Sequence, residues 1–193
     1  MKGKPNQEVH FFPSWSPDSK WLVFNSVTCG AGNACSSYNA SATRLRLLRA
    51  IGDDGNPTAV ADDQPGAGMN LPTPIELSAA TRLANQTTNW PKFSPFLQGS
   101  LGFIVFNAKF AYGHRSAGTP QLFLSAVDLD VAQKVNGGQS GGDPSYAPLW
   151  LPFQDETTAN HSAIWTTDVA CTQAADCPGE FACTGGVCVP TLG

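Results

Sequence analysis

Residues 13–25 read Pro-Ser-Trp-Ser-Pro-Asp-Ser-Lys-Trp-Leu-Val-Phe-Asn and decide the fold more than any other stretch of the chain. Pro17 presets φ for a type I turn, and the serine and aspartate side chains beside it can bond to nearby backbone groups. The aromatic and β-branched run 21–24 then has the composition of a buried strand. The stretch therefore predicts a β-hairpin.

The beginning of this stretch recurs along the chain. The pattern of proline, any residue, aromatic, any residue and proline occurs three times, at 13–17, 91–95 and 148–152. The runs that follow also agree, with Trp-Leu-Val-Phe-Asn at 21–25, Phe-Ile-Val-Phe-Asn at 103–107 and a weaker Ala-Ile-Trp at 163–165. Since repetition is the signature of repeat architectures, the three copies predict three similar units.

Each unit is expected to contain two hairpins, and so four strands. Proline does not donate to a strand ladder, so the motif prolines are expected to bracket a short strand at its ends. In the first unit the outer strands are predicted around Leu45–Leu47 and at 58–60, joined by an Asp-Gly turn. In the second they are predicted at 121–124 and from Val127 onward, closed by Asn136-Gly137-Gly138.

The motif residues at 13–24 resemble the blade motif of TolB-like β-propellers, whose usual form has Asp-Gly where this chain has Asp18-Ser19. The segment Asn-Trp-Pro-Lys-Phe-Ser-Pro at 89–95 resembles the same motif in a later blade, whereas the copy at 148–152 departs further from it. The resemblance covers roughly residues 10–168. It implies a surface-exposed or periplasmic propeller used for protein interaction, and it brings no catalytic residues.

The fold predicted for this chain is therefore all-β: a partial β-propeller of about three four-stranded blades with a disulfide-rich C-terminal tail. The blades are assigned to residues 1–168 and the tail to residues 169–193. A closed propeller needs about four to eight blades, so we expect an incomplete ring, the C-terminal part of a longer one. The alternative is a small stand-alone β-sheet protein. The blade aromatics are expected between layers, at Trp15, Trp21, Phe24, Phe93, Phe103, Phe106, Trp150 and Trp165.

Composition supports a turn-rich, strand-rich chain and excludes several partners. The 193 residues include 19 Gly and 15 Pro, only 13% are charged, and the net charge is −4. A nucleic-acid-binding surface needs a basic face, which this charge does not favour, so no nucleic acid partner is predicted. A membrane span needs about 20 consecutive apolar residues, and none is present.

Six cysteines fall into two groups. Cys29 and Cys35 enclose a short Gly-rich loop, and a local disulfide is favoured over a redox pair because the spacing is not Cys-x-x-Cys. The second group is a tail of four cysteines, for which two disulfides are predicted with three pairings open, at Cys171, Cys177, Cys183 and Cys188. A zinc site is the rival, although zinc ribbons usually have cysteine pairs two to four residues apart.

Disulfides indicate an oxidising compartment, so a periplasmic or extracellular location is predicted. The first residues, Met-Lys-Gly-Lys-Pro-Asn-Gln-Glu, have no apolar segment of a signal peptide. The export signal is therefore expected upstream of this chain, unless the cysteines are reduced.

Residues for chemistry are sparse, and no cofactor, metal or catalytic residue is predicted. His10, His114 and His161 are dispersed and are interpreted as solvated loop residues. No Gly-x-Ser-x-Gly nucleophile elbow occurs. The acidic runs 53–56 and 61–63 lack the spacing of a calcium loop, and Asp-Gly is first a turn signal.

The predicted function is a non-enzymatic protein-interaction or scaffold module of a bacterial envelope or secreted protein. The expected contact loops are 28–42, 62–88 and 110–119, and the last contains the candidate binding residues Tyr112, His114 and Arg115. The alternative is the catalytic or non-catalytic propeller of a secreted peptidase or polysaccharide-degrading enzyme. A fragment without independent function is a third possibility.

Overall fold

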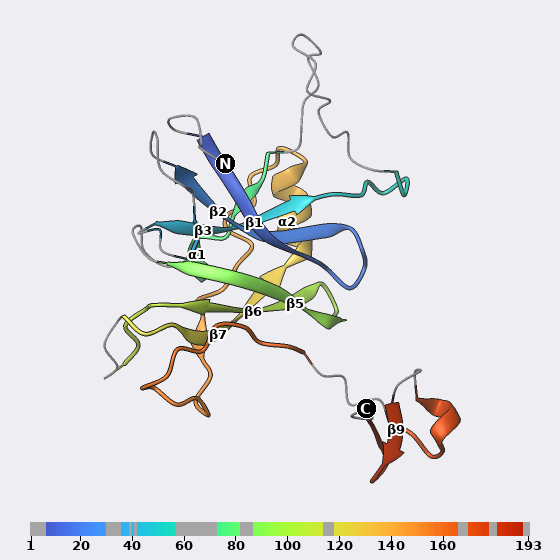
Figure 1. The fold of residues 1–193 in the computed structure, drawn as a ribbon. Helices are drawn as coiled ribbons and strands as arrows, with labels where there is room; N and C mark the ends of the chain where they lie inside the picture. The colour runs from blue at the N-terminus through green and yellow to red at the C-terminus, as the bar shows by residue number, and fades with distance from the viewer. Residues whose placement is uncertain are drawn as a thin grey trace. The chain divides into compact units, whose positions relative to one another are not determined.

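The computed structural model describes residues 7–29, 36–38, 40, 42–56, 73–81, 87–113, 118–165, 170–177 and 181–190. The chain divides into two compact units, Met1–Ala163 and Ile164–Gly193. The described residues of the first unit form two four-stranded β-sheets and two helices, and those of the second include a small hairpin (Figure 1). The described residues are thus mostly β, as predicted.

The first sheet is an antiparallel meander in the order β1-β2-β3-β4. Its strands are β1 (Gln7–Trp15), β2 (Trp21–Cys29), β3 (Thr43–Arg49) and the two-residue β4 (Ile75–Glu76). The hairpin predicted from residues 13–25 is confirmed, because β1 pairs with β2 across the turn at 16–20. The fourth strand expected at 58–60 lies outside the described residues.

That turn follows the chemistry of its sequence. The Ser19 N–H donates to the Ser16 carbonyl at 2.9 Å, and the Trp21 N–H donates to Ser16 Oγ at 2.9 Å. Ser19 has a φ of 57°. Left-handed backbone favours glycine, so the serine adopts this conformation at some cost in free energy.

The second sheet has the same meander order, β5-β6-β7-β8. Its strands are β5 (Thr88–Gln98), β6 (Leu101–Ala108), β7 (Gln121–Asp128) and β8 (Leu149–Trp150). The third motif copy therefore supplies β8, the last strand of the second sheet, and does not begin a third sheet. Within the described part of the chain there are two four-stranded sheets, so the expectation of about three is wrong.

The strand expected from Val127 onward is a helix instead. The end of β7 is followed directly by the helix α2 (Leu129–Asn136). The other helix of the described residues, α1 (Ser78–Thr81), is shorter and follows β4. Asp128 caps α2 by accepting from the N–H groups of Asp130 and Val131. Leu129 and Ala132 are buried on one side, so the segment satisfies a helical pattern that the strand prediction overlooked.

The first proline of each of the first two motif copies lies inside a strand, which corrects the expectation that the prolines bracket strand ends, whereas in the third copy Pro148 and Pro152 do flank the short strand β8. Pro13 falls in the register shift between Phe11 and Ser14, and Pro91 in the shift between Asn89 and Lys92. A bulge leaves a residue out of the ladder, so the missing N–H of proline costs no hydrogen bond there.

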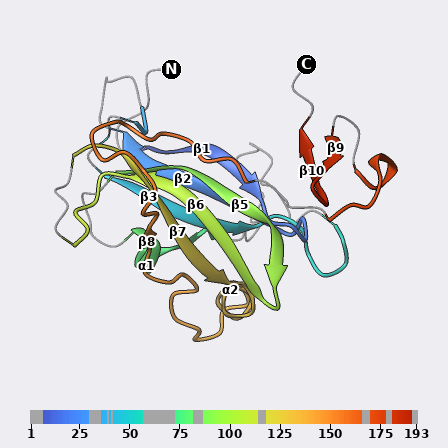
Figure 2. The ribbon, with the colours of Figure 1, turned by 90° about the horizontal axis from the view of Figure 1, so that it is seen from below.

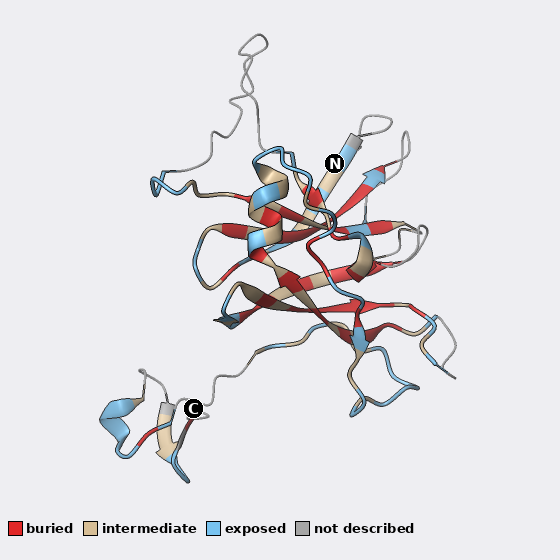
Figure 3. Ribbon diagram, turned by 180° about the vertical axis from the view of Figure 1, so that it is seen from behind, coloured by how far each residue is buried: buried red, intermediate tan, exposed pale blue. Residues whose placement is uncertain are grey.

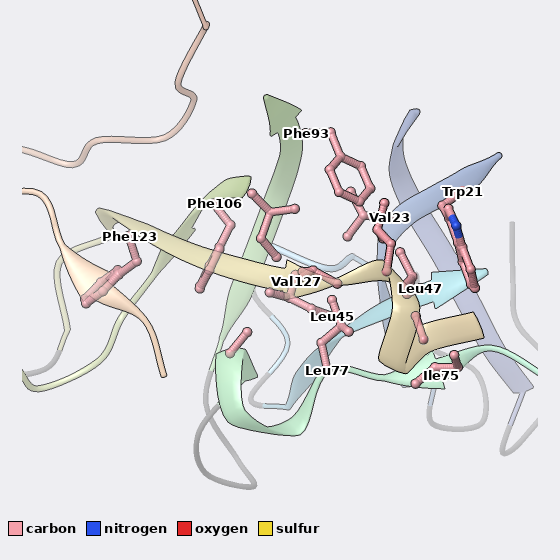
Figure 4. Close-up of a cluster of buried hydrophobic side chains, with 14 of the residues drawn as sticks. Trp21, Val23, Leu45, Leu47, Ile75, Leu77, Phe93, Phe106, Phe123 and Val127 are labelled. Atoms are coloured by element: carbon pink, nitrogen blue, oxygen red, sulfur yellow. The ribbon is translucent and has the colours of Figure 1, made fainter. Parts of the chain in front are cut away.

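One apolar core joins the two sheets (Figure 4). Val23, Leu45 and Leu47 of the first sheet meet Phe93 and other residues of the second, and Figure 3 shows buried segments on both sheets. The expected aromatics Trp21, Phe24, Phe93 and Phe106 are buried. Trp15 is not, because 51% of it is exposed. Three others are partly exposed, namely Phe103, Trp150 and Trp165.

The second unit is held by two disulfides, Cys171–Cys183 and Cys177–Cys188. It contains η1 (Ala174–Asp176) and a hairpin of β9 (Phe181–Thr184) with β10 (Val187–Pro190), visible in Figure 2. The Asp176 carboxylate accepts from the Thr172 backbone and hydroxyl and from the Gln173 N–H, and these bonds lower its pKa to about 2. The predicted disulfide-rich tail is confirmed, and its pairing is one of the three left open.

Candidate functional site

The two repeats place an unusual backbone feature at equivalent positions. Phe12 and Trp90 each directly precede the first motif proline, and their φ angles are 53° and 50°. Left-handed backbone costs a non-glycine residue about 1–3 kcal/mol, and a following proline favours extended backbone instead. Such strain persists only where the surrounding structure fixes it, and it gathers at functional sites.

These bulges bring four rings from four separate segments together: Phe12, Tyr38, Trp90 and His161, the aromatic cluster. The Phe12 and Trp90 rings meet edge to face with centroids 5.1 Å apart. Tyr38 stacks on Trp90 at 5.8 Å, and His161 lies 5.2 Å from Tyr38 and 5.5 Å from Trp90. Bulges re-aim side chains, and here they turn two strand residues toward each other.

Polar groups surround the rings. The Lys109 ammonium lies 5.2 Å from the centroid of the Tyr38 ring, a cation–π contact. The Tyr38 hydroxyl and His161 Nε2 are 3.5 Å apart, and the Asn107 amide donates to the His161 carbonyl. Phe12 is 36% exposed and the other three rings are partly exposed, so the cluster reaches the surface.

A buried polar contact between the sheets fixes the base of the cluster. The Thr88 N–H donates to Thr43 Oγ1 at 2.5 Å, and Thr43 Oγ1 donates to the Thr88 carbonyl at 2.7 Å. Next along β5, Asn89 Oδ1 lies 3.2 Å from Asn25 Nδ2, and both side chains are almost fully buried. These contacts attach β5 to the first sheet immediately before Trp90 and so fix the position of that residue.

The cluster is suited to recognition. Partly exposed aromatic side chains offer large apolar faces with little conformational entropy to lose, and Lys109 adds one positive charge. Sequence reasoning missed it because its members are far apart in the chain. His161 was interpreted as a solvated loop residue, whereas it packs against Tyr38 and Trp90. The signal that was available is the aromatic residue before proline in both repeats, at Phe12 and Trp90.

Of the predicted binding residues, the structure describes only Tyr112. Its ring packs against Phe123 at 6.1 Å and Trp150 at 6.5 Å, at the margin of the core. His114 and Arg115 lie outside the described residues, so a binding role for this loop remains a prediction.

The cysteines bear out the disulfide interpretation. Cys29 is disulfide-bonded, and its expected partner Cys35 lies outside the described residues. In the tail, three sulfurs lie within 4.8 Å of one another, those of Cys171, Cys177 and Cys188. All three are engaged in the two tail disulfides, so the rival zinc interpretation of the four tail cysteines is wrong.

The acidic run at 53–56 has a structural role. Asp53 bonds to the buried Arg49 guanidinium at 2.5 Å, and Arg49 also lies over the Trp21 ring. The Asp54 carboxylate accepts from the Asn56 side chain and backbone, and these bonds lower its pKa. The run is therefore a turn that the Arg49–Asp53 ion pair attaches to the end of the first sheet. The second acidic run, 61–63, lies outside the described residues.

The geometry defines the chain as an all-β protein with two joined meanders, a surface aromatic cluster and a disulfide-stapled unit. No known protein family, characterised protein or solved structure matches it. None of the helices in the described residues has the length and hydropathy of a membrane span.

Proposed function

We propose that this chain is a non-enzymatic protein-interaction module, a pair of TolB-like propeller blades from a bacterial envelope or secreted protein, which binds its partner through the aromatic cluster. The observation that carries the proposal is the pairing of Phe12 and Trp90. They are equivalent residues of two repeats, both in left-handed backbone and in ring contact at the surface.

The blade assignment rests on topology and sequence together. Each of the two four-stranded sheets is an antiparallel meander that begins with a motif strand, as a propeller blade does. Ser14 Oγ of β1 accepts from the Phe93 N–H of β5 at 3.1 Å, so the first strands of the two meanders lie side by side. In a propeller the corresponding strands are the innermost ones, and a ligand at the axis meets several blades at once.

The proposed compartment is supported by the cysteines. Two disulfides in a unit with few apolar residues, and a third bond at Cys29, are stable in an oxidising environment such as the periplasm or the extracellular space. A protein-interaction module loses less conformational entropy on binding when its contact side chains are already held in place. The rings of the aromatic cluster are held by their contacts with one another.

A displayed-peptide library selected on the immobilised full chain tests the function without a known partner. We expect enriched peptides to bind the chain, and Phe12→Asn to weaken them at least tenfold, about 1.4 kcal/mol. Asparagine tolerates left-handed backbone, so the exchange removes the ring and retains the bulge.

Phe153→Asn is the matched control, because Phe153 is 84% exposed and makes no part of the cluster. Its affinity for the same peptides should equal that of the wild-type chain. The proposal fails if no peptide is enriched, or if both variants bind the enriched peptides equally well.

A further inference from the structure

The same motif position differs sharply in exposure between the two sheets. Trp15 and Phe93 are the central aromatic residues of the first two motif copies. Phe93 is 6% exposed, whereas Trp15 is 51% exposed. In the second sheet the aromatic ring is buried because the first sheet packs on it. In the first sheet the equivalent ring has no such cover.

Strand register extends this equivalence to a whole face. In the first sheet Trp15 lies opposite Leu22, and Leu22 lies opposite Leu48. Directly opposed residues of an antiparallel pair point to the same side of a sheet, so these three side chains share one face. In the second sheet the residue equivalent to Leu22 is Ile104, which lies opposite Phe93 and is fully buried. We call the face with Trp15, Leu22 and Leu48 the outer face of the first sheet.

The outer face differs from its buried counterpart in one important respect. Arg46 lies opposite Phe24, as Phe123 lies opposite Phe106 in the second sheet. Where the second sheet has a fully buried phenylalanine, the first has an arginine.

Beside the row of Trp15, Leu22 and Leu48 the outer face carries a group of charged side chains, which we call the arginine rim. Arg46 pairs with Glu8 at 3.0 Å and with Glu76 at 3.5 Å, and Arg44 pairs with Glu76 at 2.8 Å. Exposed apolar side chains next to paired charges are typical of interfaces that form between separately folded partners.

We infer that the outer face of the first sheet is a docking surface for another β-sheet, one that presents aliphatic side chains to Trp15 and polar groups to the arginine rim. The existing interface between the two sheets shows which side chains cover such a face. The second sheet's counterpart is covered by Val23, Leu45 and Leu47, which are aliphatic, and by the hydroxyl of Thr43. The inference rests on this internal repeat and does not require the proposed peptide site.

A second copy of the chain is not the occupant we infer. The face of the first sheet that could serve as cover is already used inside each copy. The opposite face of the second sheet carries Val105 and Asn107, which are 4% and 2% exposed, and the Asn107 side chain donates to the His161 carbonyl. The central positions of both faces are thus already buried within each copy, so we infer that the cover comes from a different sheet.

A tandem protein tests this directly. A copy of residues 1–86 is placed ahead of Met1 of the full chain, with Trp15→Phe in the added copy so that peptides from the two are distinguishable. Hydroxyl-radical labelling read by mass spectrometry then reports the exposure of the original Trp15. We expect labelling to fall about eightfold, the ratio of the exposures of Trp15 and Phe93.

Two variants of the added copy separate docking from folding. Val23→Lys with Leu47→Lys changes the face that would cover Trp15, and should restore labelling to the level of the unextended chain. Leu22→Lys with Leu48→Lys places the same charges on the opposite face of the added copy, and should leave Trp15 protected.

Three results would overturn the inference. The first is undiminished labelling of Trp15 in the tandem protein, and the second is equal protection by both lysine variants. The third is protection of Trp15 in the unextended chain that rises with protein concentration, since this would identify a second copy as the occupant.

Discussion

The two sheets of this protein have the same strand order and begin with the same motif, yet they use that motif differently. In the second sheet Phe93, Ile104 and Phe123 form a closed core, whereas in the first Trp15 is half exposed and Arg46 replaces the phenylalanine. The difference shows that the motif specifies a strand, a bulge and a turn. Which side chains become buried depends on whether another sheet covers them.

The largest effect on stability is expected from exchanging the two residues at which the sheets differ most, Phe123 and Arg46. Phe123→Arg would place a charge in a fully buried position, so we expect a loss of about 4 kcal/mol or more in the free energy of unfolding. Arg46→Phe removes only partly exposed ion pairs and should change it by about 1 kcal/mol or less. Guanidinium denaturation followed by circular dichroism measures both. Equal losses in the free energy of unfolding for the two variants would show that Arg46 is as deeply buried in solution as Phe123.

The sequence predicts those parts of the fold in which the repeated motif is followed by a clear turn and an apolar run. The hairpin at 13–25, the hairpin of β5 with β6 and the third strand of each sheet follow from turn chemistry and apolar runs, because these are local properties. The fourth strands, β4 and β8, are only two residues long and have no such local signal. The copy at 148–152 was misassigned because its pattern resembles the others while its neighbours do not. Only Leu149–Trp150 form a strand there, and they complete an existing sheet.

What sequence missed depends on contacts between distant segments. The α2 helix had a local signal in Asp128 followed by Leu129 and Ala132, and a search for a capped helix could have found it. The aromatic cluster had almost none, because the proximity of Tyr38 and His161 to the two bulges arises only when the sheets join. Exposure of Trp15 likewise depends on tertiary packing, which a motif does not encode.

Truncating the central motif aromatic in each sheet gives the next largest contrast. Phe93→Ala leaves a cavity among Val23, Ile104 and their neighbours, so we expect a loss of about 3–5 kcal/mol in the free energy of unfolding. Trp15→Ala removes a ring that is half in water already, and we expect about 1 kcal/mol. Denaturation followed by circular dichroism is the measurement. A cost for Trp15→Ala that matches Phe93→Ala would mean that Trp15 is covered in solution.

The polar contact that joins the sheets should have an intermediate effect. Thr43→Val removes the hydroxyl that accepts from the Thr88 N–H, leaving that donor buried, so a loss of about 1–3 kcal/mol is expected. Thr28→Val on neighbouring β2 is the control, because Thr28 is exposed and should change stability by about 0.5 kcal/mol or less. If thermal unfolding shows the two variants to be equally stable, the sheets are joined by apolar packing alone.

The smallest effect should reverse the order of the two sheets, because the motif serine accepts the shorter hydrogen bond in the first. The Trp21 N–H donates to Ser16 Oγ at 2.9 Å, while its counterpart, the Phe103 N–H, lies 3.4 Å from Ser94 Oγ. Each hydroxyl also donates one hydrogen bond, Ser16 to Asp18 and Ser94 to the Phe96 carbonyl, so alanine removes two bonds at either position. Ser16→Ala should therefore cost about 1 kcal/mol and Ser94→Ala about 0.5 kcal/mol, since the accepted bond is weaker at Ser94. Hydrogen exchange of the Trp21 and Phe103 amides provides a local reading of the same contrast. A larger cost at Ser94 would mean that burial, and not the length of the accepted hydrogen bond, determines the contribution of the motif serine in both sheets.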